Sequence, residues 1–191
     1  IPSIIGININ SIKNKFPISK PYIVLCPTNS HVANVNHRGY RSWPEKNWKN
    51  LIQKILDQTS FNILLVGSKD EKKYFKTFYP LDQRVYDISG MTDISELISI
   101  MKESKCVVAT DSGSAHIAGA SAKNIISIHG PTNFYQSAPY KTENNSIKIA
   151  SLNLGCSPCY DTEVIKNCKK NICMHSLGPD IVFDMIKDFN L

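Results

Sequence analysis

Short apolar runs alternate along this chain with longer segments in which apolar residues recur every three or four positions. Apolar runs of four or five residues are typical of buried strands, and the longer pattern is typical of helices with one buried face. The runs predict strands over residues 22–26, 62–66, 85–88, 106–109, 125–128 and 147–150. The periodic segments predict helices over residues 45–58, 72–79, 94–103, 114–122 and 180–189. Strands that alternate with helices indicate a parallel sheet of the α/β class.

A polar turn after the strand predicted over residues 106–109 is the strongest candidate site. The turn consists of Thr110, Asp111, Ser112 and Gly113, and the next helix starts at Ser114. Ligands of parallel sheets bind beyond the carboxyl ends of the strands, where a helix N-terminus offers N–H groups and a positive dipole end to phosphate. Gly113 would let the backbone approach a ligand closely, and His116 follows one turn later. The simpler alternative is that Asp111 or Ser112 caps the helix and that His116 is a surface residue.

The order and spacing of the motifs in this region resemble the donor-binding segment of glycosyltransferase family 9, the heptosyltransferase family. The matching residues are Asp111, Ser112, Gly113, His116, Gly130, Pro131, Thr132, Pro139 and Tyr140. Ala138 stands where the family usually has glycine. Arg41 stands in the place of the lysine in the family's Lys-x-Trp-Pro motif, two residues before Trp43. The resemblance extends over roughly residues 22–189.

The resemblance implies an α/β fold with a Rossmann-like parallel sheet flanked by helices. It implies the C-terminal half of a two-domain GT-B glycosyltransferase, with a cysteine-rich late loop. Residues 1–20 would then form a linker or arm, and residues 21–191 would form the nucleotide-sugar (donor) binding domain, including the cysteine cluster 156–173. The N-terminal half, which holds the acceptor and the base in this family, would be missing from this chain. We therefore expect no certain catalytic residue here and no useful rate of sugar transfer by this chain alone.

The resemblance also implies a set of donor-binding residues. The family's lysine lies near the donor diphosphate, so Arg41 is expected to stabilise the leaving group together with Ser112 and Gly113. The family's glutamate binds the ribose, and Glu71 matches it in position. The complete expected set is Thr28, Asn29, Ser30, Arg41, Glu71, Gly90, Met91, Asp111, Ser112, Gly113, Ser114 and His116.

Several of these residues have simpler interpretations that the sequence leaves open. Residues 28–30 are phosphate-loop residue types, but they are equally ordinary turn residues. Glu71 would be favoured at the start of a helix by the helix dipole alone. Trp43 is expected to be a packing residue that anchors the loop carrying Arg41. Arginine keeps the charge of lysine, but its planar guanidinium would donate to a diphosphate with a different geometry.

Four late cysteines indicate a metal site. They fall within residues 156–173 and are Cys156, Cys159, Cys168 and Cys173. A Cys-x-x-Cys turn brings two sulfurs together, and a second pair would complete a tetrahedron that suits zinc or a single iron. Free thiols and two disulfides are the alternatives, although a cytoplasmic enzyme should lack stable disulfides. A subgroup that resembles the autotransporter heptosyltransferases binds iron with a similar cluster, so we expect structural Fe or Zn and no organic cofactor.

Composition narrows the function classes only slightly. The formal charge of +6 suits an anionic ligand such as a nucleotide diphosphate, and it equally suits an ordinary basic surface. The lysines are scattered and no aromatic stacking motif is present, so no nucleic-acid partner is expected. No stretch approaches the length of a membrane span.

The family resemblance implies inverting transfer of a sugar, typically heptose from ADP-heptose, to a lipopolysaccharide core or a protein acceptor. It implies a cytoplasmic location, with a peripheral position at the inner membrane as one option. The oligomeric state is left open, with a homo-oligomer among the options. The alternatives are a non-catalytic module that binds a nucleotide or a partner, and a metal module that binds nucleic acid. The lack of clustered base-reading residues argues against the second alternative.

Overall fold

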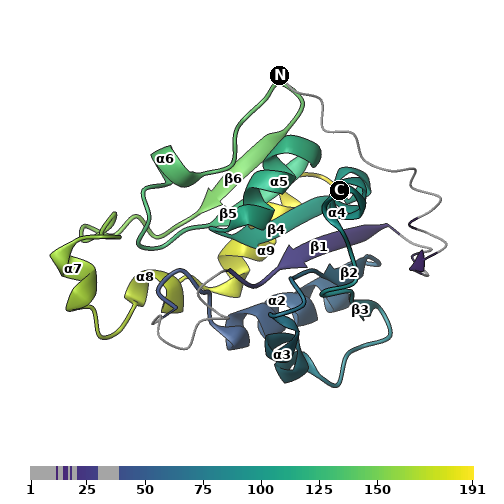
Figure 1. The fold of residues 1–191 in the computed structure, drawn as a ribbon, viewed down its shortest axis with the longest axis horizontal. Helices are drawn as coiled ribbons and strands as arrows, with labels where there is room; N and C mark the ends of the chain where they lie inside the picture. Colours follow the sequence, from purple (N-terminus) through teal and green to yellow (C-terminus); the bar gives the residue numbers. More distant parts are fainter. Residues whose placement is uncertain (1–11, 13–14, 17, 19–20, 30–38) are drawn as a thin grey trace.

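The computed structural model describes residues 12, 15–16, 18, 21–29 and 39–191, in which one parallel sheet forms the centre of the fold (Figure 1). Its strand order is β3-β2-β1-β4-β5-β6, and every neighbouring pair is parallel. The strands are β1 (Tyr22–Cys26), β2 (Asn62–Leu65), β3 (Val85–Asp87), β4 (Cys106–Thr110), β5 (Asn124–Ile128) and β6 (Ser146–Ala150). This is the strand order of Rossmann-type doubly wound sheets, so the predicted fold class is confirmed.

Helices cover both faces of the sheet, because successive strand residues point to opposite sides. In β1, Ile23 and Leu25 pack into a core with α2 (Glu45–Gln58) and α9 (Pro179–Lys187). Val24 points the other way, into a second core with α4 (Ile94–Glu103) and α5 (Gly113–Ser121). Burial of each Ile, Leu or Val side chain contributes roughly 1.5–3 kcal/mol relative to exposure. Burial on both faces explains why the strands are continuous apolar runs.

The helix predicted over residues 72–79 is divided into two short elements. The chain forms α3 (Lys72–Phe75) and then the 3-10 helix η1 (Lys76–Phe78). Residues 68–71 form a turn before α3, in which the Ser68 N–H donates to the Glu71 carboxylate at 2.7 Å. The end comes at Tyr79, which precedes Pro80 and adopts the extended conformation that a following proline favours.

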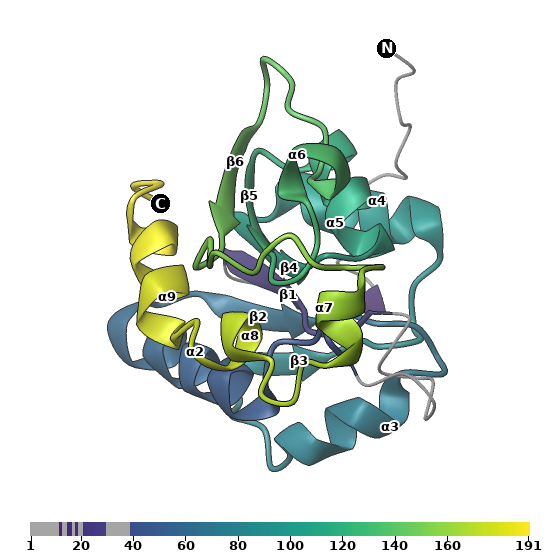
Figure 2. The same cartoon turned by 90° about the vertical axis from the view of Figure 1, so that its left-hand side faces the viewer.

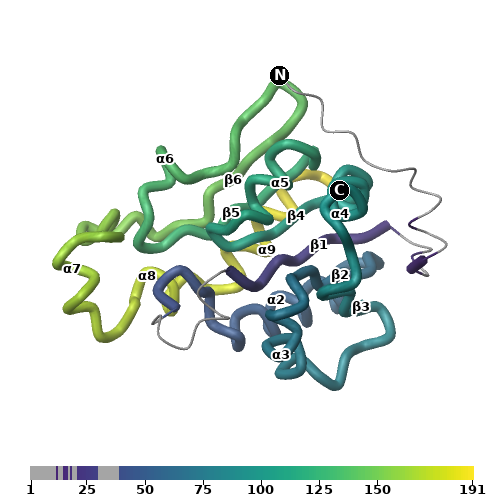
Figure 3. The backbone as a smooth tube through the Cα atoms, viewed as in Figure 1, coloured from purple at the N-terminus to yellow at the C-terminus, as the bar shows by residue number. Residues whose placement is uncertain are grey.

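Three short helices that the pattern did not predict lie at the end of the sheet toward which the strand arrows point (Figures 1 and 2). They are α6 (Phe134–Ser137), α7 (Glu163–Lys166) and α8 (Ile172–His175), and each has four residues. Four residues are too few to give a helical period. Between β6 and α9 the chain runs past the carboxyl ends of the strands and carries α7 and α8 (Figure 3).

The linker predicted over residues 1–20 falls mostly outside the described residues and stays a prediction. Of the described ones, Ile12, Phe16 and Ile18 are buried in the core on the α4 side. Lys15 forms an ion pair with Glu96 at 2.7 Å. In the part of the chain that the structure describes, no helix is both long and apolar enough to cross a membrane.

Candidate functional site

The loops that follow β1 and β4 meet at the point where the strand order reverses. The chain leaves β1 toward β2 on one side and leaves β4 toward β5 on the other, which opens a crevice between the two loops. Thr28 and Asn29 follow β1, and Asp111 follows β4; all three are buried. The Thr110 hydroxyl donates to the Thr28 carbonyl at 3.1 Å and joins the two loops. The fold thus brings two predicted groups of site residues together.

A cavity of about 320 Å³ lies at this crevice, within the usual size range of small-molecule sites. Six of the residues predicted to bind the sugar donor line it, namely Thr28, Asn29, Glu71, Ser112, Gly113 and Ser114. Apolar side chains line it as well, from Val66, Ile94, Leu97 and Ile117. A cavity with both a polar rim and an apolar wall can hold a ligand that has a charged part and a flat organic part.

The N-terminus of α5 opens into the cavity at Ser112. Ser112 occupies the N-cap position but makes no side-chain capping bond. Its Oγ is buried and has no hydrogen-bond partner among the described residues, so simple capping does not account for Ser112. A Cβ added to Gly113 would meet no atom within 4 Å, which shows that the space beside the backbone is open. Backbone N–H groups and the helix dipole form a site suited to a phosphate, and the buried Ser112 hydroxyl lies beside it without a partner among the described residues.

An ion pair with Asp111 connects Arg41 to the same region. Its Nη1 lies 3.7 Å from Oδ2 of Asp111, and the two side chains are 19% and 6% exposed. That Oδ2 is buried without a hydrogen-bond partner among the described residues. The guanidinium also lies over the ring of Tyr160, 5.3 Å from the ring centroid. Neither Arg41 nor Asp111 lines the cavity itself.

Trp43 has the packing role that was expected of it. Its side chain is 1% exposed, and its Nε1 donates to the Leu177 carbonyl at 2.8 Å. Its ring meets that of Trp48 edge-on, with centroids 4.9 Å apart. Because Trp43 lies two residues after Arg41, this packing anchors one end of the loop that carries the guanidinium.

Glu71 combines the two interpretations that the sequence left open. It lines the cavity, as a ribose-binding carboxylate would. Its Oε2 also accepts from the Ser68 N–H at 2.7 Å and so closes the turn before α3. A carboxylate has about four acceptor positions, so one bond to the backbone leaves capacity for sugar hydroxyls.

The structure places the remaining predicted residues outside the cavity lining. Gly90 has φ +67°, and an added Cβ would lie 2.8 Å from the Lys69 Cα, so glycine is required there by the close approach of two loops. Met91 is 45% exposed. His116 is exposed on α5. Ser30 lies outside the described residues.

One buried histidine was not singled out from the sequence, because only the residues that follow it, Gly130, Pro131 and Thr132, carry the family resemblance. His129 follows β5 and is 0% exposed. Its Nε2 lies 2.8 Å from the Ser127 hydroxyl, and its Nδ1 lies 3.2 Å from that of Thr132. Burial lowers the pKa of His129, and the neighbouring Asp111 opposes that shift only in part. A neutral His129 therefore fixes the turn that leads to Pro131.

The four late cysteines line one cavity of about 330 Å³, so their spacing correctly predicted that they gather. All four are free thiols, as are Cys26 and Cys106, which are buried in strands as expected. Burial and the neighbouring thiols raise the pKa of Cys159, and they raise that of Cys173 to about 11. However, within the described part of the chain no group of three or more His, Cys, Asp or Glu residues is arranged to hold a metal. As placed, the thiols are near one another but do not form a coordination shell.

Comparisons with known proteins match this architecture. The family model described as glycosyltransferase family 9 (heptosyltransferase) matches residues 9–170. A lipooligosaccharide heptosyltransferase 2 of Campylobacter jejuni is 30% identical over 135 residues, which cover 67% of this chain and 41% of that protein. A solved structure of the Escherichia coli ADP-heptose LPS heptosyltransferase II superimposes with a TM-score of 0.72 at 16% identity, over 94% of this chain and 50% of that one.

The iron-containing dodecameric glycosyltransferase TibC of enterotoxigenic E. coli also shares the fold. Its TM-score is 0.65 at 13% identity, over 91% of this chain and 47% of that chain. The chain thus spans about half the length of the solved structures and 41% of the C. jejuni relative.

Proposed function

Because the chain belongs to glycosyltransferase family 9, we propose that it is the donor-binding part of a heptosyltransferase, which binds ADP-heptose or a related nucleotide sugar. One observation carries this proposal: donor residues predicted from three separate loops line a single cavity at the switch point of the sheet. The N-terminus of α5 opens into that cavity, and the Ser112 hydroxyl there has no hydrogen-bond partner in the part of the chain that the structure describes. On this proposal residues 21–191 form the donor domain.

The lining suggests how the donor would lie. The diphosphate would lie at the N-terminus of α5, against Ser112 and the backbone of Gly113. The ribose would face Glu71, whose carboxylate accepts hydrogen bonds from paired hydroxyls. The base would lie against the apolar wall that Ile94 and Leu97 contribute. Asp111 would face the sugar, so replacing Asp111 by Ala should weaken binding of ADP-heptose more than binding of ADP.

In the reaction, this chain would act on the leaving group. Inverting transfer breaks the bond between the anomeric carbon and the diphosphate, and negative charge builds up on the departing phosphate. Arg41 and the dipole of α5 would stabilise that charge without having to reorganise. The acceptor and the base would come from outside this chain, and holding the acceptor against the anomeric carbon can supply roughly 7–11 kcal/mol of the barrier. We therefore propose that the chain alone binds donor and does not transfer sugar at a useful rate.

The family suggests candidates for the acceptor, the location and the assembly. A lipopolysaccharide or lipooligosaccharide core is the favoured acceptor, since the C. jejuni and E. coli relatives are named for it, and a protein acceptor is the alternative. On either reading the enzyme would act in the cytoplasm or at the inner face of the membrane. The dodecameric state of TibC supports a homo-oligomer as the form to test first.

A metal at the four cysteines is a separate proposal. Its support is that Cys156, Cys159, Cys168 and Cys173 are free thiols around one cavity, and that TibC contains iron. An ion of iron or zinc would have to draw the sulfurs closer together than they lie here, since they do not form a coordination shell. Elemental analysis of protein purified without added metal should then find close to one ion per chain. A value near zero with four titratable thiols would refute the proposal.

Calorimetry with ADP and a product assay test the main proposal together. We expect the chain to bind ADP with one site, and to release no ADP from ADP-heptose in the presence of a lipopolysaccharide core acceptor. Addition of a family acceptor domain should restore turnover. Absence of ADP binding would refute the donor assignment, whereas binding without turnover under every condition would favour a non-catalytic nucleotide-binding module.

A further inference from the structure

The loop that carries Arg41 touches the late segment of the chain at a few defined points. This late segment, residues 151–178, joins β6 to α9 and is called here the cysteine segment. Arg41 lies in a tight turn in which the Ser42 N–H donates to the Gly39 carbonyl at 2.7 Å, with Gly39 at φ +58°. A cavity of about 620 Å³ lies between this turn and α8. Contacts with the cysteine segment on the far side of this cavity contribute to the position of the turn.

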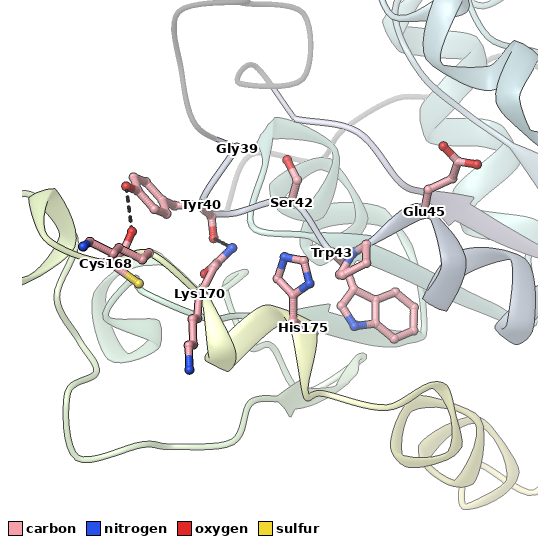
Figure 4. Close-up of a pocket in the computed structure, with 11 residues that line it drawn as sticks. Gly39, Tyr40, Ser42, Trp43, Glu45, Cys168, Lys170 and His175 are labelled. Atoms are coloured by element: carbon pink, nitrogen blue, oxygen red, sulfur yellow. Dashed lines mark hydrogen bonds between the residues drawn. The ribbon is translucent and has the colours of Figure 1, made fainter.

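Two hydrogen bonds hold the residue before the arginine. The Tyr40 hydroxyl donates to the Cys168 carbonyl at 3.3 Å (Figure 4). The Asn171 side-chain amide donates to the Tyr40 carbonyl at 3.2 Å. Both partners belong to the cysteine segment, more than a hundred residues further along the chain. They fix the backbone from which the Arg41 side chain extends.

A third contact holds the guanidinium itself. The Arg41 guanidinium lies over the Tyr160 ring at 5.3 Å from the centroid, within the range of a cation–π contact. The backbone at Tyr160 is itself fixed, because its N–H and that of Cys159 both donate to the Pro131 carbonyl, at 2.9 and 2.8 Å. The turn after β5 therefore holds the residue that carries the ring, and the guanidinium contacts both this ring and Asp111.

We infer that the cysteine segment positions the diphosphate-binding arginine, with Tyr160 as the positioning residue for Arg41. This inference rests on the proposed function, in which Arg41 contacts the donor diphosphate. An arginine side chain has many rotamers, and binding is weakened if the correct one must be selected when the ligand arrives. Contact with the Tyr160 ring favours one rotamer before the ligand arrives. Tyr160 does not need to touch the donor to perform this role.

The test compares binding of ADP with binding of adenosine, which lacks the diphosphate. Calorimetry, with competition for the weaker ligand, is performed on the protein and on Tyr160→Leu, Tyr160→Phe, Arg41→Ala and the Tyr160→Leu/Arg41→Ala double variant. Tyr160→Leu should weaken ADP binding about threefold to tenfold, as expected for loss of a cation–π contact, and leave adenosine binding unchanged. Tyr160→Phe keeps the ring and should restore ADP binding. In the Arg41→Ala background, Tyr160→Leu should have no further effect on ADP binding.

Three results would overturn the inference. If Arg41→Ala weakens ADP binding and Tyr160→Leu does not, Arg41 binds the donor without help from the ring, and the proposed function stands. If Tyr160→Leu weakens ADP and adenosine binding alike, or acts equally in the Arg41→Ala background, Tyr160 has a general structural role. If Arg41→Ala leaves ADP binding unchanged, the diphosphate contact in the proposed function fails as well. Tyr160→Gln also removes the ring, and it replaces the leucine variant if that variant does not fold.

Discussion

Replacing Ser112 by Ala should separate ligand binding from folding. The Ser112 Oγ is buried and has no hydrogen-bond partner among the described residues, although it stands at the N-cap of α5. A buried hydroxyl without a partner destabilises the fold, so its removal should leave the free energy of unfolding unchanged or raise it. The usual N-cap substitution lowers stability by about 0.5–2 kcal/mol, so the expected sign here is the opposite of the ordinary one.

The same change should weaken ADP binding. If the Ser112 hydroxyl donates to the diphosphate, it forms a hydrogen bond to a charged group, which contributes about 1.5–3 kcal/mol. That range corresponds to roughly 10-fold to 150-fold in the dissociation constant for ADP. Adenosine, which has no phosphate, should bind the variant as well as it binds the unchanged protein.

The assay pairs calorimetry with urea unfolding, and the same helix offers a matched control. Ser121 lies at the other end of α5, where its hydroxyl donates to the Ile117 carbonyl at 2.8 Å. Ser121→Ala should leave ADP affinity unchanged. The reasoning is refuted if Ser112→Ala binds ADP within twofold of the unchanged protein, or if it loses stability as an ordinary capping residue would.

Three further predictions concern the elements around the site, each measured by urea unfolding. Gly90→Ala should lower the free energy of unfolding by about 1–3 kcal/mol, because alanine is strained at φ +67° and its Cβ would lie 2.8 Å from the Lys69 Cα. Asp93→Ala should cost about 0.5–2 kcal/mol, because Asp93 accepts from the Glu96 N–H at 2.8 Å in a capping box at the start of α4. Burial lowers the pKa of His129, so in mild acid the unfolded chain binds a proton that the folded chain does not. The free energy of unfolding should therefore decrease as the pH drops below about 6.5. His129→Gln should remove the part of this decrease that is due to His129.

A specific result would contradict each of these three predictions. A Gly90→Ala variant as stable as the unchanged protein would show that the two loops can move apart. Unchanged stability in Asp93→Ala would mean that α4 is held by packing alone. If His129→Gln and the unchanged protein lose the same stability between pH 7.5 and pH 5.5, other groups carry the pH dependence.

Most of the fold follows from the sequence because burial on both sheet faces leaves a strong signal. Residues 106–109 are apolar throughout, and in the sheet Val107 and Val108 are fully buried on opposite faces. The helix over residues 45–58 matches α2 at both ends. α7 and α8 could not be predicted, because helices of four residues depend on tertiary contacts rather than on a repeating apolar pattern.

Part of the candidate site could be predicted from the sequence, and part of it could not. Residues that follow strands could be placed together, because the carboxyl ends of parallel strands share one edge of the sheet. The contact of Arg41 with Tyr160 could not be foreseen, since it joins two irregular segments that are far apart in the chain. The spacing of the cysteines predicted their gathering around one cavity, but the separation of their sulfurs depends on side-chain and loop conformations that spacing does not determine.

A crystal structure of the protein with ADP would test the central claim most directly. We predict the diphosphate in the cavity between the loops after β1 and β4, with phosphate oxygens within about 2.7–3.2 Å of the first backbone N–H groups of α5. The Ser112 hydroxyl should donate to the same phosphate, and the ribose should face Glu71. ADP bound in another cavity, such as the one lined by the four cysteines, or ADP in this crevice with its phosphates turned away from α5, would contradict the account.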